Sequence, residues 1–521
     1  MITMPDTIEQ RIGDHTYLYE VESYWDPEKK QPRQRRKYLG RKDPGSGKPV
    51  RSRSRTTPRL CKDYGHVYRL QTIAEQLGLT SILRHTFPED YQTLLALAFF
   101  EISEAAPLYL FPYWRESTGL EALSLLGSKD LTRFTGRVGR REQERLAFAR
   151  AWTQQCGEVE AIVFDITSVS CYAEFMDYVE WGYNRDEEPL PQVNFGIIYA
   201  EHSQLPLYYQ LYPGSIPDVT TLKNIVNYLE LFQLKERLFV LDRGFYSASN
   251  LSTLHQAPIK CIIPMSRSVK LFSALLSKNK RKLSDLNHSF IFADQVLFHV
   301  QDTVKINQIT FQAHLYFNDR RRSEEVSAFL RKILELEAAT QKQPFQTKEE
   351  AMEYLASHGK ATTELFQVKN NNGPLEIVRN TKALSQRIAT MGTTLMLTNH
   401  PQLDRAKILE LYRRKDYLEK IFDVLKNELD GKRLRGHSKD VINGRLFIKF
   451  ISLILYSALA NKMREKDLFK HYSIREIMYE LKKLRIVEMD NGTSYLTEIS
   501  KRQREIFSKL EVEIPTLQHS Y

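Results

Sequence analysis

The 521-residue sequence has few cysteines, no apolar N-terminal segment and no long uninterrupted hydrophobic run. Its four cysteines are scattered without a Cys-x-x-Cys pair, which argues against a structural zinc site and indicates a reducing compartment. Residues Met1 to Asp6 show no secretory signal. The longest apolar run, Leu446 to Ala460, contains Lys449 and is too short to cross a bilayer, so it predicts a buried helix. We therefore expect a cytoplasmic protein of several domains without membrane contact.

Acidic residues are almost missing between Lys29 and Lys62, where Asp43 alone stands against fourteen lysines and arginines. This segment carries +13 of a net charge of +11, so the rest of the chain is close to −2 (11 − 13). Such a block attracts polyanions and holds phosphates, although a solvated arm without function has a similar composition. We expect phosphate contacts from four arginines of the arm: Arg51, Arg53, Arg55 and Arg59.

Three carboxylates occupy distinctive settings. Asp165 lies in an apolar strand predicted over 161–166, Asp242 ends a second strand, and Glu419 lies on a predicted helix. Most aspartates at strand ends cap turns, but two within one α/β block are more indicative of a site. Three carboxylates that converge stay ionised only beside cations. The pattern therefore suits hard divalent ions and in-line phosphodiester chemistry.

The helix predicted over 404–428 carries polar groups on one face. At about 100° per residue, four of them fall within an arc of roughly 60°. These four are Tyr412, Lys415, Glu419 and Lys426. An exposed face with helical ion pairs would show the same pattern. A separate apolar stripe instead favours a helix that packs on a sheet edge and presents Glu419 to a cleft; the stripe is Leu418, Ile421, Phe422 and Leu425.

Between 160 and 265, predicted strands and helices alternate, which is typical of an α/β sheet with its site at the strand ends. The strands are predicted at 161–166, 193–199, 207–211, 238–242 and 260–264, and the helices at 219–233 and 247–256. A hairpin is predicted over 15–40, and helices over 65–155. Within these helices, a helix-turn-helix at Leu70 to Leu83 and plain helical packing fit about equally well.

The motifs resemble those of the DDE transposases of bacterial insertion sequences, in the branch with a Tyr-Arg-Glu-Lys (YREK) signature. Asp165-Ile-Thr167 and Asp242-Arg-Gly-Phe-Tyr246 carry the first part of the resemblance. The signature spacing Tyr-x2-Arg-x3-Glu-x6-Lys is matched except at Lys415, where the family usually has arginine. Lysine keeps the charge but loses the bidentate fork. Further similar segments start at Trp181, Pro213, Leu397 and Gly444, so that the resemblance runs from about 15 to 480.

The resemblance implies an α/β fold: an RNase H-like catalytic core with a mixed strand/helix insertion, preceded by a basic arm and a helical DNA-binding domain and followed by C-terminal helices. The implied divisions are 1–62 (hairpin and arm), 63–155 (helical DNA-binding domain), 156–268 and 391–430 (core), 269–390 (insertion) and 431–521 (C-terminal helices).

It also implies the site. Asp165, Asp242 and Glu419 are the expected catalytic residues and ligands of two Mg²⁺ ions, for which Mn²⁺ can substitute. The residues expected to hold DNA phosphates there are Tyr412, Lys415, Lys426 and Arg243.

The implied function is cut-and-paste transposition. A homodimer in the prokaryotic cytoplasm, associated with the nucleoid, would bind the terminal inverted repeats of its element, cleave them and join the 3′ ends to target DNA. Relatives stack a flipped base on a tryptophan of the insertion and cleave through a hairpin. Here all four tryptophans precede Asp242, which leaves the hairpin step open. Two alternatives are a non-transposing RNase H-like nuclease and a transposase-derived DNA-binding protein with no activity.

Overall fold

A computed structural model describes residues 6–50, 56–120, 127–157, 159–172, 178–184, 186, 188–216, 218–234, 236–343, 345–359, 362–369, 375–429 and 431–516. The chain forms two compact units. The arm unit comprises residues 1–63, 484–498 and 516–521, and the main unit comprises 64–483 and 499–515. Each unit is described by itself.

The arm unit contains two small antiparallel sheets. The first has the order β1 (Asp6–Ile12), β2 (His15–Asp26), β3 (Gln31–Lys42) and β4 (Pro49–Val50); the second has the order β19 (Ser494–Leu496), β18 (Arg485–Met489) and β5 (Pro58–Asp63). Asp26 pairs with Gln31 across the β2–β3 turn, which confirms the predicted hairpin. Residues 31–38 of β3 are exposed, so its basic side chains face solvent. Arg59 is exposed on β5, whereas Arg51, Arg53 and Arg55 lie outside the described residues.

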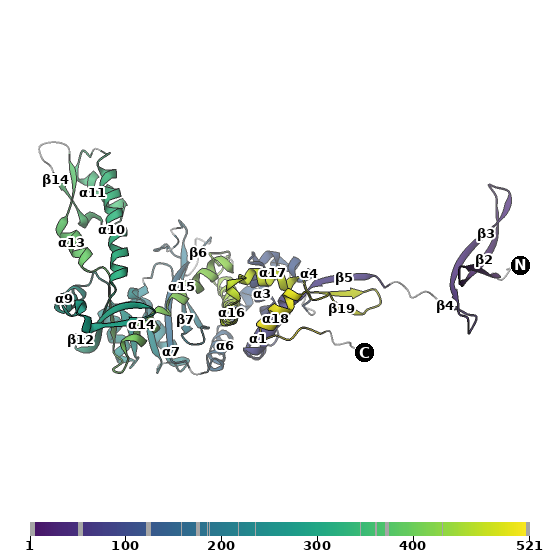
Figure 1. Cartoon of the computed structure of the whole chain (residues 1–521), viewed down its shortest axis with the longest axis horizontal. Coiled ribbons are helices and arrows are strands. Elements are labelled where there is room, and N and C mark those ends of the chain that lie inside the picture. Colours follow the sequence, from purple (N-terminus) through teal and green to yellow (C-terminus); the bar gives the residue numbers. More distant parts are fainter. Residues whose placement is uncertain are drawn as a thin grey trace. The chain divides into compact units, whose positions relative to one another are not determined.

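The main unit is built on one β-sheet with parallel and antiparallel strands (Figure 1). Its strand order is β11-β12-β13-β16-β10-β9-β6-β7-β8, and the short strand β17 (Arg433–Leu434) also pairs with β6. The central strands are β6 (Ala161–Cys171), β7 (Gln192–Ala200), β8 (Pro206–Pro213), β9 (Leu238–Leu241) and β10 (Cys261–Pro264). β6, β7 and β8 form an antiparallel meander, whereas β9 and β10 continue the sheet parallel to β6. The five strands predicted in this block are all present. β6 and β7 are buried along their whole length, as their apolar, β-branched composition requires.

Helices connect these strands and carry short-range signals that the sequence contains. α7 (Asp218–Leu231) precedes β9, and α8 (Ala248–Gln256) follows it. The side chain of Ser247 caps α8 by accepting a hydrogen bond from the backbone of Asn250 at 3.0 Å. The aromatic side chain of Phe164 packs against those of Phe239 and Phe245. Buried aromatic contacts thereby support β9 and the part of β6 that precedes Asp165.

The segment between β10 and β16 (Thr393–Thr398) contributes both to the sheet and to a separate small core. α9 (Lys270–Asn279) leads to β11 (Ser289–Phe292), β12 (Gln295–Ile306) and β13 (Ile309–Phe317), which extend the sheet through β16. The remainder is α10 (Asp319–Thr340), α11 (Lys348–Ser357), α12 (Thr362–Leu365), β14 (Phe366–Lys369), β15 (Glu376–Arg379) and α13 (Thr381–Ala389). These elements, grouped together in Figure 1, enclose their own core of Ile333, Leu336, Leu355, Phe366 and Leu384.

Helices from the first and the last parts of the main unit's sequence form one helical layer. It contains α1 (Gly65–Gln76), α2 (Leu79–Thr86), α3 (Tyr91–Glu104), α4 (Phe111–Ser117), α5 (Ser128–Arg140), α6 (Glu142–Gln155), α16 (Lys439–Glu465), α17 (Ile474–Lys482) and α18 (Lys501–Lys509). α16 is long and apolar enough to cross a membrane. The same holds for α3 taken together with the following helical segment 108–117, although the two are bent against each other by 106°. However, 78% of the apolar window of α16 is buried inside the protein, as predicted for a core helix.

The helix predicted over 404–428 is not continuous, and that prediction is wrong. α14 (Arg405–Arg413) ends before a tight turn, α15 (Asp416–Asp423) follows, and η5 (Val424–Glu428) is π-helical. Arg414, at the turn, forms ion pairs with Glu201 at the end of β7 and with Glu410. Because the 3.6-residue period is interrupted twice, one helical face cannot be extended from Tyr412 to Lys426.

α5 and α16 approach so closely that only glycine fits at their contact. A Cβ atom at Gly139 would lie 1.7 Å from the carbonyl oxygen of Asp440, and one at Gly444 would lie 1.9 Å from that of Thr135. The Gly139→Ala substitution should therefore separate the helices and cost on the order of 1–3 kcal/mol, which differential scanning fluorimetry would register as a lower melting temperature.

The matched control is Gly136→Ala on the same helix, where the new Cβ would lie 3.6 Å from Val441 at an ordinary contact distance. It should be neutral or slightly stabilising, because alanine is the better helix former. Equal melting temperatures for the two variants would contradict a close backbone contact at Gly139.

Candidate active site

The sheet places Asp165 and Asp242 next to each other. Phe164 of β6 pairs with Leu241 of β9 in parallel register, and each aspartate is the following residue. Along β6, residues 161–164 pair with β9 and residues 170–171 pair with β17. Asp165 lies in the part of β6 between these two pairings. Asp165 is buried, and its Oδ1 accepts a hydrogen bond from the amide of Ile166 at 2.9 Å. The two carboxylates therefore lie side by side, with Asp242 directly after β9 and Asp165 within β6, which continues to Cys171 beyond the predicted strand end at 166.

Lys415 joins the two carboxylates. Its Nζ lies 2.8 Å from Oδ1 of Asp242 and 3.9 Å from Oδ2 of Asp165. Its side chain is almost buried, although the residue lies at the turn between α14 and α15. Burial acts to lower the pKa of Lys415, but the charges of Asp165 and Asp242 outweigh that effect, and the pKa is raised. The ammonium group is thus held charged between the two acids.

Tyr412 and Arg243 lie at the same place. Burial raises the pKa of the Tyr412 phenol, while the charge of Lys415 acts to lower it and that of Asp242 to raise it further. Arg243 also acts on the Tyr412 pKa, and its own side chain is exposed at the start of the turn after β9. The structure therefore brings together Asp165, Asp242, Lys415, Tyr412 and Arg243.

Glu419 and Lys426 lie differently. Glu419 is exposed in the first turn of α15, and Lys426 donates a hydrogen bond to Asp186 at 2.6 Å from within η5. Among the residues that the structure describes, no three His, Cys, Asp or Glu side chains are grouped as they would be around a metal ion. Glu419 is therefore not gathered with the two aspartates.

The two aspartates do fit a cation. They offer carboxylate oxygens from two rigid strands, which are the ligands that Mg²⁺ and Mn²⁺ prefer, and they already enclose the positive charge of Lys415. The expected third ligand, Glu419, lies on the helix that starts directly after Lys415. For all three carboxylates to hold the same ions, α15 would have to bring Glu419 closer to Asp165 and Asp242.

Sequence reasoning missed the acids of the β6–β7 connection. Asp186 pairs with Lys426, and Glu188 pairs with Arg433 at 2.9 Å and with Lys432 at 3.4 Å. The hydrogen bond from Arg433 is the main reason that the pKa of Glu188 falls to about 2. Asp186 ends the motif that begins at Trp181, so the signal was present, but nothing in the sequence identified its partner.

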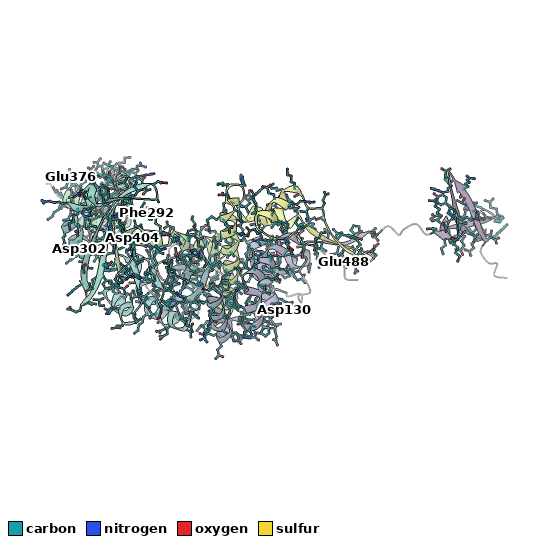
Figure 2. All side chains as sticks on the ribbon, turned by 60° about the horizontal axis from the view of Figure 1, so that its bottom comes forward. Asp130, Phe292, Asp302, Glu376, Asp404 and Glu488 are labelled. Atoms are coloured by element: carbon teal, nitrogen blue, oxygen red, sulfur yellow. The ribbon has the colours of Figure 1, made fainter. Side chains whose placement is uncertain are left out.

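A cavity of about 450 Å³ opens beside Tyr412 and Asp416, between α10, α14 and strands of the sheet. Three arginines line it: Arg320, Arg321 and Arg413. Arg413 also stacks over the ring of Phe292 at 4.6 Å, a residue labelled in Figure 2. The cavity next to Tyr412 thus combines cations of α10 with one of α14.

Comparison with known proteins gives one family. The profile of the Transposase DDE domain family matches residues 158–455, which is more than half of the chain and includes Asp165, Asp242 and Glu419. None of the curated proteins compared with the chain matches it. Among solved structures, the piggyBac transposase synaptic complex with hairpin DNA is similar over 87% of this chain and 78% of that chain, with 8% identity and a TM-score of 0.34.

Removing the charge of Lys415 tests the electrostatics of this site. Lys415→Met leaves buried Asp165 without its ammonium partner, so we expect a loss of about 3 kcal/mol in stability at neutral pH. Because the folded-state pKa of Lys415 is raised, its contribution is fully present below its ordinary pKa of 10.5 and is lost as pH rises through the folded value. The difference between wild type and variant in urea unfolding should shrink accordingly at high pH.

Lys420→Met is the matched control, because Lys420 lies on α15, which begins directly after Lys415, but is exposed and contacts the ring of Tyr417. It should change stability by no more than about 1 kcal/mol. If the two variants lost the same stability, Lys415 would not hold the two carboxylates together in solution.

Proposed function

We propose that this chain, which belongs to the family of transposases with a DDE domain, binds the terminal inverted repeats of an insertion sequence. There it would catalyse metal-dependent DNA cleavage and strand transfer by cut-and-paste. The observation that carries the proposal is the pair Asp165 and Asp242, which lie side by side on neighbouring strands around one cation within the matched domain. The spacing of Tyr412, Glu419 and Lys426 supports the Tyr-Arg-Glu-Lys branch, with Lys415 in the arginine position.

The strand order supports an RNase H-like catalytic core as part of this proposal. Three antiparallel strands, β8, β7 and β6, are followed by β9 and β10 parallel to β6. The acids stand on the central strand and at the end of its parallel neighbour, where open sheets place their sites. The inserted segment from 269 to 390 separates this part of the core from the strand and helices that carry Glu419.

Asp165, Asp242 and Glu419 would hold the divalent cations, Mg²⁺ or Mn²⁺. Such ions supply charge neutralisation and orientation for in-line displacement at phosphorus. The chain's own cations complete the site: Lys415 and Arg243 lie beside the aspartates and offer donors to backbone phosphates. The phenol of Tyr412 lies among them as a further hydrogen-bond donor, kept protonated by its raised pKa.

The DNA itself would be held over a larger surface. The exposed basic strand β3 and Arg59 supply charge in the arm unit, and Arg51, Arg53 and Arg55 extend that charge in sequence. Phosphate contacts of this kind supply affinity without reading sequence, so recognition of the ends would fall to the helices between 63 and 155. Because two ends must be brought together, we propose a homodimer that acts in the bacterial cytoplasm at the nucleoid.

The carboxylates give the first functional test. Asp165→Asn, Asp242→Asn and Glu419→Gln should each abolish cleavage of DNA that carries the sequences flanking the gene, while binding of that DNA in a mobility-shift assay is largely kept. Asp423→Asn, exposed on the same helix as Glu419, should cleave normally.

Full cleavage by any one of the three variants in Mg²⁺ would remove that residue from the site. Cleavage by the wild type without joining of the 3′ ends to target DNA would indicate a nuclease. Binding with no cleavage by the wild type would indicate a DNA-binding protein without activity.

Lys426 can be separated from its ion pair. If it contacts the scissile phosphate, Lys426→Ala should lower the cleavage rate on the order of a hundredfold, about 3 kcal/mol, because a cation that stabilises transition-state charge is lost. Asp186→Asn removes the partner but keeps the ammonium group, so it should cleave at nearly the wild-type rate. Equal losses in single-turnover assays would mean that Lys426 serves only to pair with Asp186.

A further inference from the structure

The connection after β6 exposes two large aromatic side chains in succession. Trp181 is 66% exposed and Tyr183 is 86% exposed, with Gly182 between them. Their neighbours Tyr172 and Tyr178 are also exposed, at 49% and 36%. Soluble proteins seldom leave contiguous aromatic surface in water unless it binds something.

The backbone that carries these side chains is firmly held. Glu180 and Gln192 exchange two backbone hydrogen bonds of 3.0 and 2.9 Å, and the side chain of Gln192 donates to the carbonyl of Tyr183 at 3.0 Å. A Cβ atom at Gly182 would lie 2.0 Å from the carbonyl oxygen of Gly214, so only glycine fits between the two aromatic residues. The exposed rings are therefore presented from a fixed support and not from a loose loop.

This support is tied at two points to elements that carry proposed site residues. Asn184 donates to the hydroxyl of Ser170 at 3.0 Å, and Ser170 lies on β6 five residues after Asp165, roughly 17 Å along the strand and on its opposite face. Asp186 accepts from Lys426, which follows Glu419 on the next segment. The aromatic pair is thus coupled to the strand that carries Asp165 and to the segment that carries Lys426.

Cations are interleaved with the aromatic rings. Arg433, which also pairs with Glu188, donates to the hydroxyl of Tyr172 at 3.0 Å and lies over its ring, and the ammonium of Lys439 lies 4.7 Å from the ring centre of Tyr178. Aromatic faces that stack on bases, together with cations that hold phosphates, are the chemistry of single-stranded nucleic acid binding. A protein partner would more readily be met by aliphatic side chains, which this patch does not offer among its described residues.

We propose that Trp181 and Tyr183 form a stacking platform for unpaired bases of the DNA strand bound at Asp165 and Asp242. The inference rests on the proposed function, because it takes the substrate to be DNA. The proposal assigns base stacking to the β6–β7 connection, whereas residues 269–390 contain no tryptophan.

The test uses the full-length protein, a fluorescein-labelled dT20 oligonucleotide and a 20-base-pair duplex of unrelated sequence. Trp181→Ala combined with Tyr183→Ala should weaken binding of dT20 at least tenfold in fluorescence anisotropy, since each lost stacking contact costs at least about fivefold. Affinity for the duplex, which depends on phosphate contacts, should stay within twofold. Trp181→Phe should keep most of the dT20 affinity because it keeps a ring.

Tyr479→Ala is the matched control, an exposed tyrosine on α17 with 53% exposure that should leave both affinities unchanged. A direct readout is available in a Trp25→Phe background. Trp114 and Trp152 are buried, so Trp181 is then the exposed tryptophan, and dT20 should quench its emission and protect it from acrylamide.

The proposal is overturned if the double variant binds dT20 as tightly as Tyr479→Ala does, or if the oligonucleotide leaves Trp181 emission unchanged. A double variant that loses self-association in sedimentation but keeps dT20 affinity would assign the patch to a second copy of the chain, which also overturns it. Cleavage of the flanking DNA is scored separately. Wild-type cleavage with unchanged dT20 binding by the variant rejects the platform alone, whereas dT20 stacking without any cleavage rejects the proposed function alone.

Discussion

The contact of one ammonium with two carboxylates organises the centre of this molecule. Asp165 and Asp242 lie side by side because β6 and β9 pair in parallel, and like charges at that separation need a cation. Lys415 provides it from the turn between α14 and α15. One residue earlier, Arg414 forms an ion pair with Glu201. Two ion pairs thus tie this turn to the sheet, directly before the start of α15, which carries Glu419.

A second buried charge pair fixes the other end of the same segment. Lys449 of α16 donates to Glu101 of α3 at 3.0 Å, and Ser452 donates to the other carboxylate oxygen at 3.0 Å. Lys449 also donates to the carbonyl of Leu429, which directly follows η5. Lys449, the charged residue within the apolar sequence of α16, therefore has a structural role. It ties the helical layer to the segment that carries Glu419 and Lys426.

Most of the sheet could be predicted from the sequence because its strands are buried on both faces and read as continuous apolar runs between turns. The two aspartates followed from those runs. The helix break could not be predicted, because Arg413, Arg414 and Lys415 are all good helix formers and the opposing cause lies on distant strands. The π-helical stretch from Val424 was missed for a similar reason, since the contacts of Lys426 and Leu429 that accompany it are tertiary. The positions of Glu419 and Lys426 relative to the aspartates were therefore beyond a periodicity argument.

The β6–β7 connection shows how the same limitation can hide a binding surface. In sequence, Trp181-Gly-Tyr183 is only a short motif with a family resemblance, and an aromatic pair of this kind is as readily a piece of core. Its meaning depends on Gly214, which is far along the chain and leaves no room for a side chain at position 182. Because the backbone is fixed on that side, the two rings are directed to solvent, and Asp186 couples them to the segment that follows Glu419. A close backbone contact and one ion pair thus fix an exposed aromatic pair next to the segment that carries Lys426, an arrangement that composition and spacing alone do not reveal.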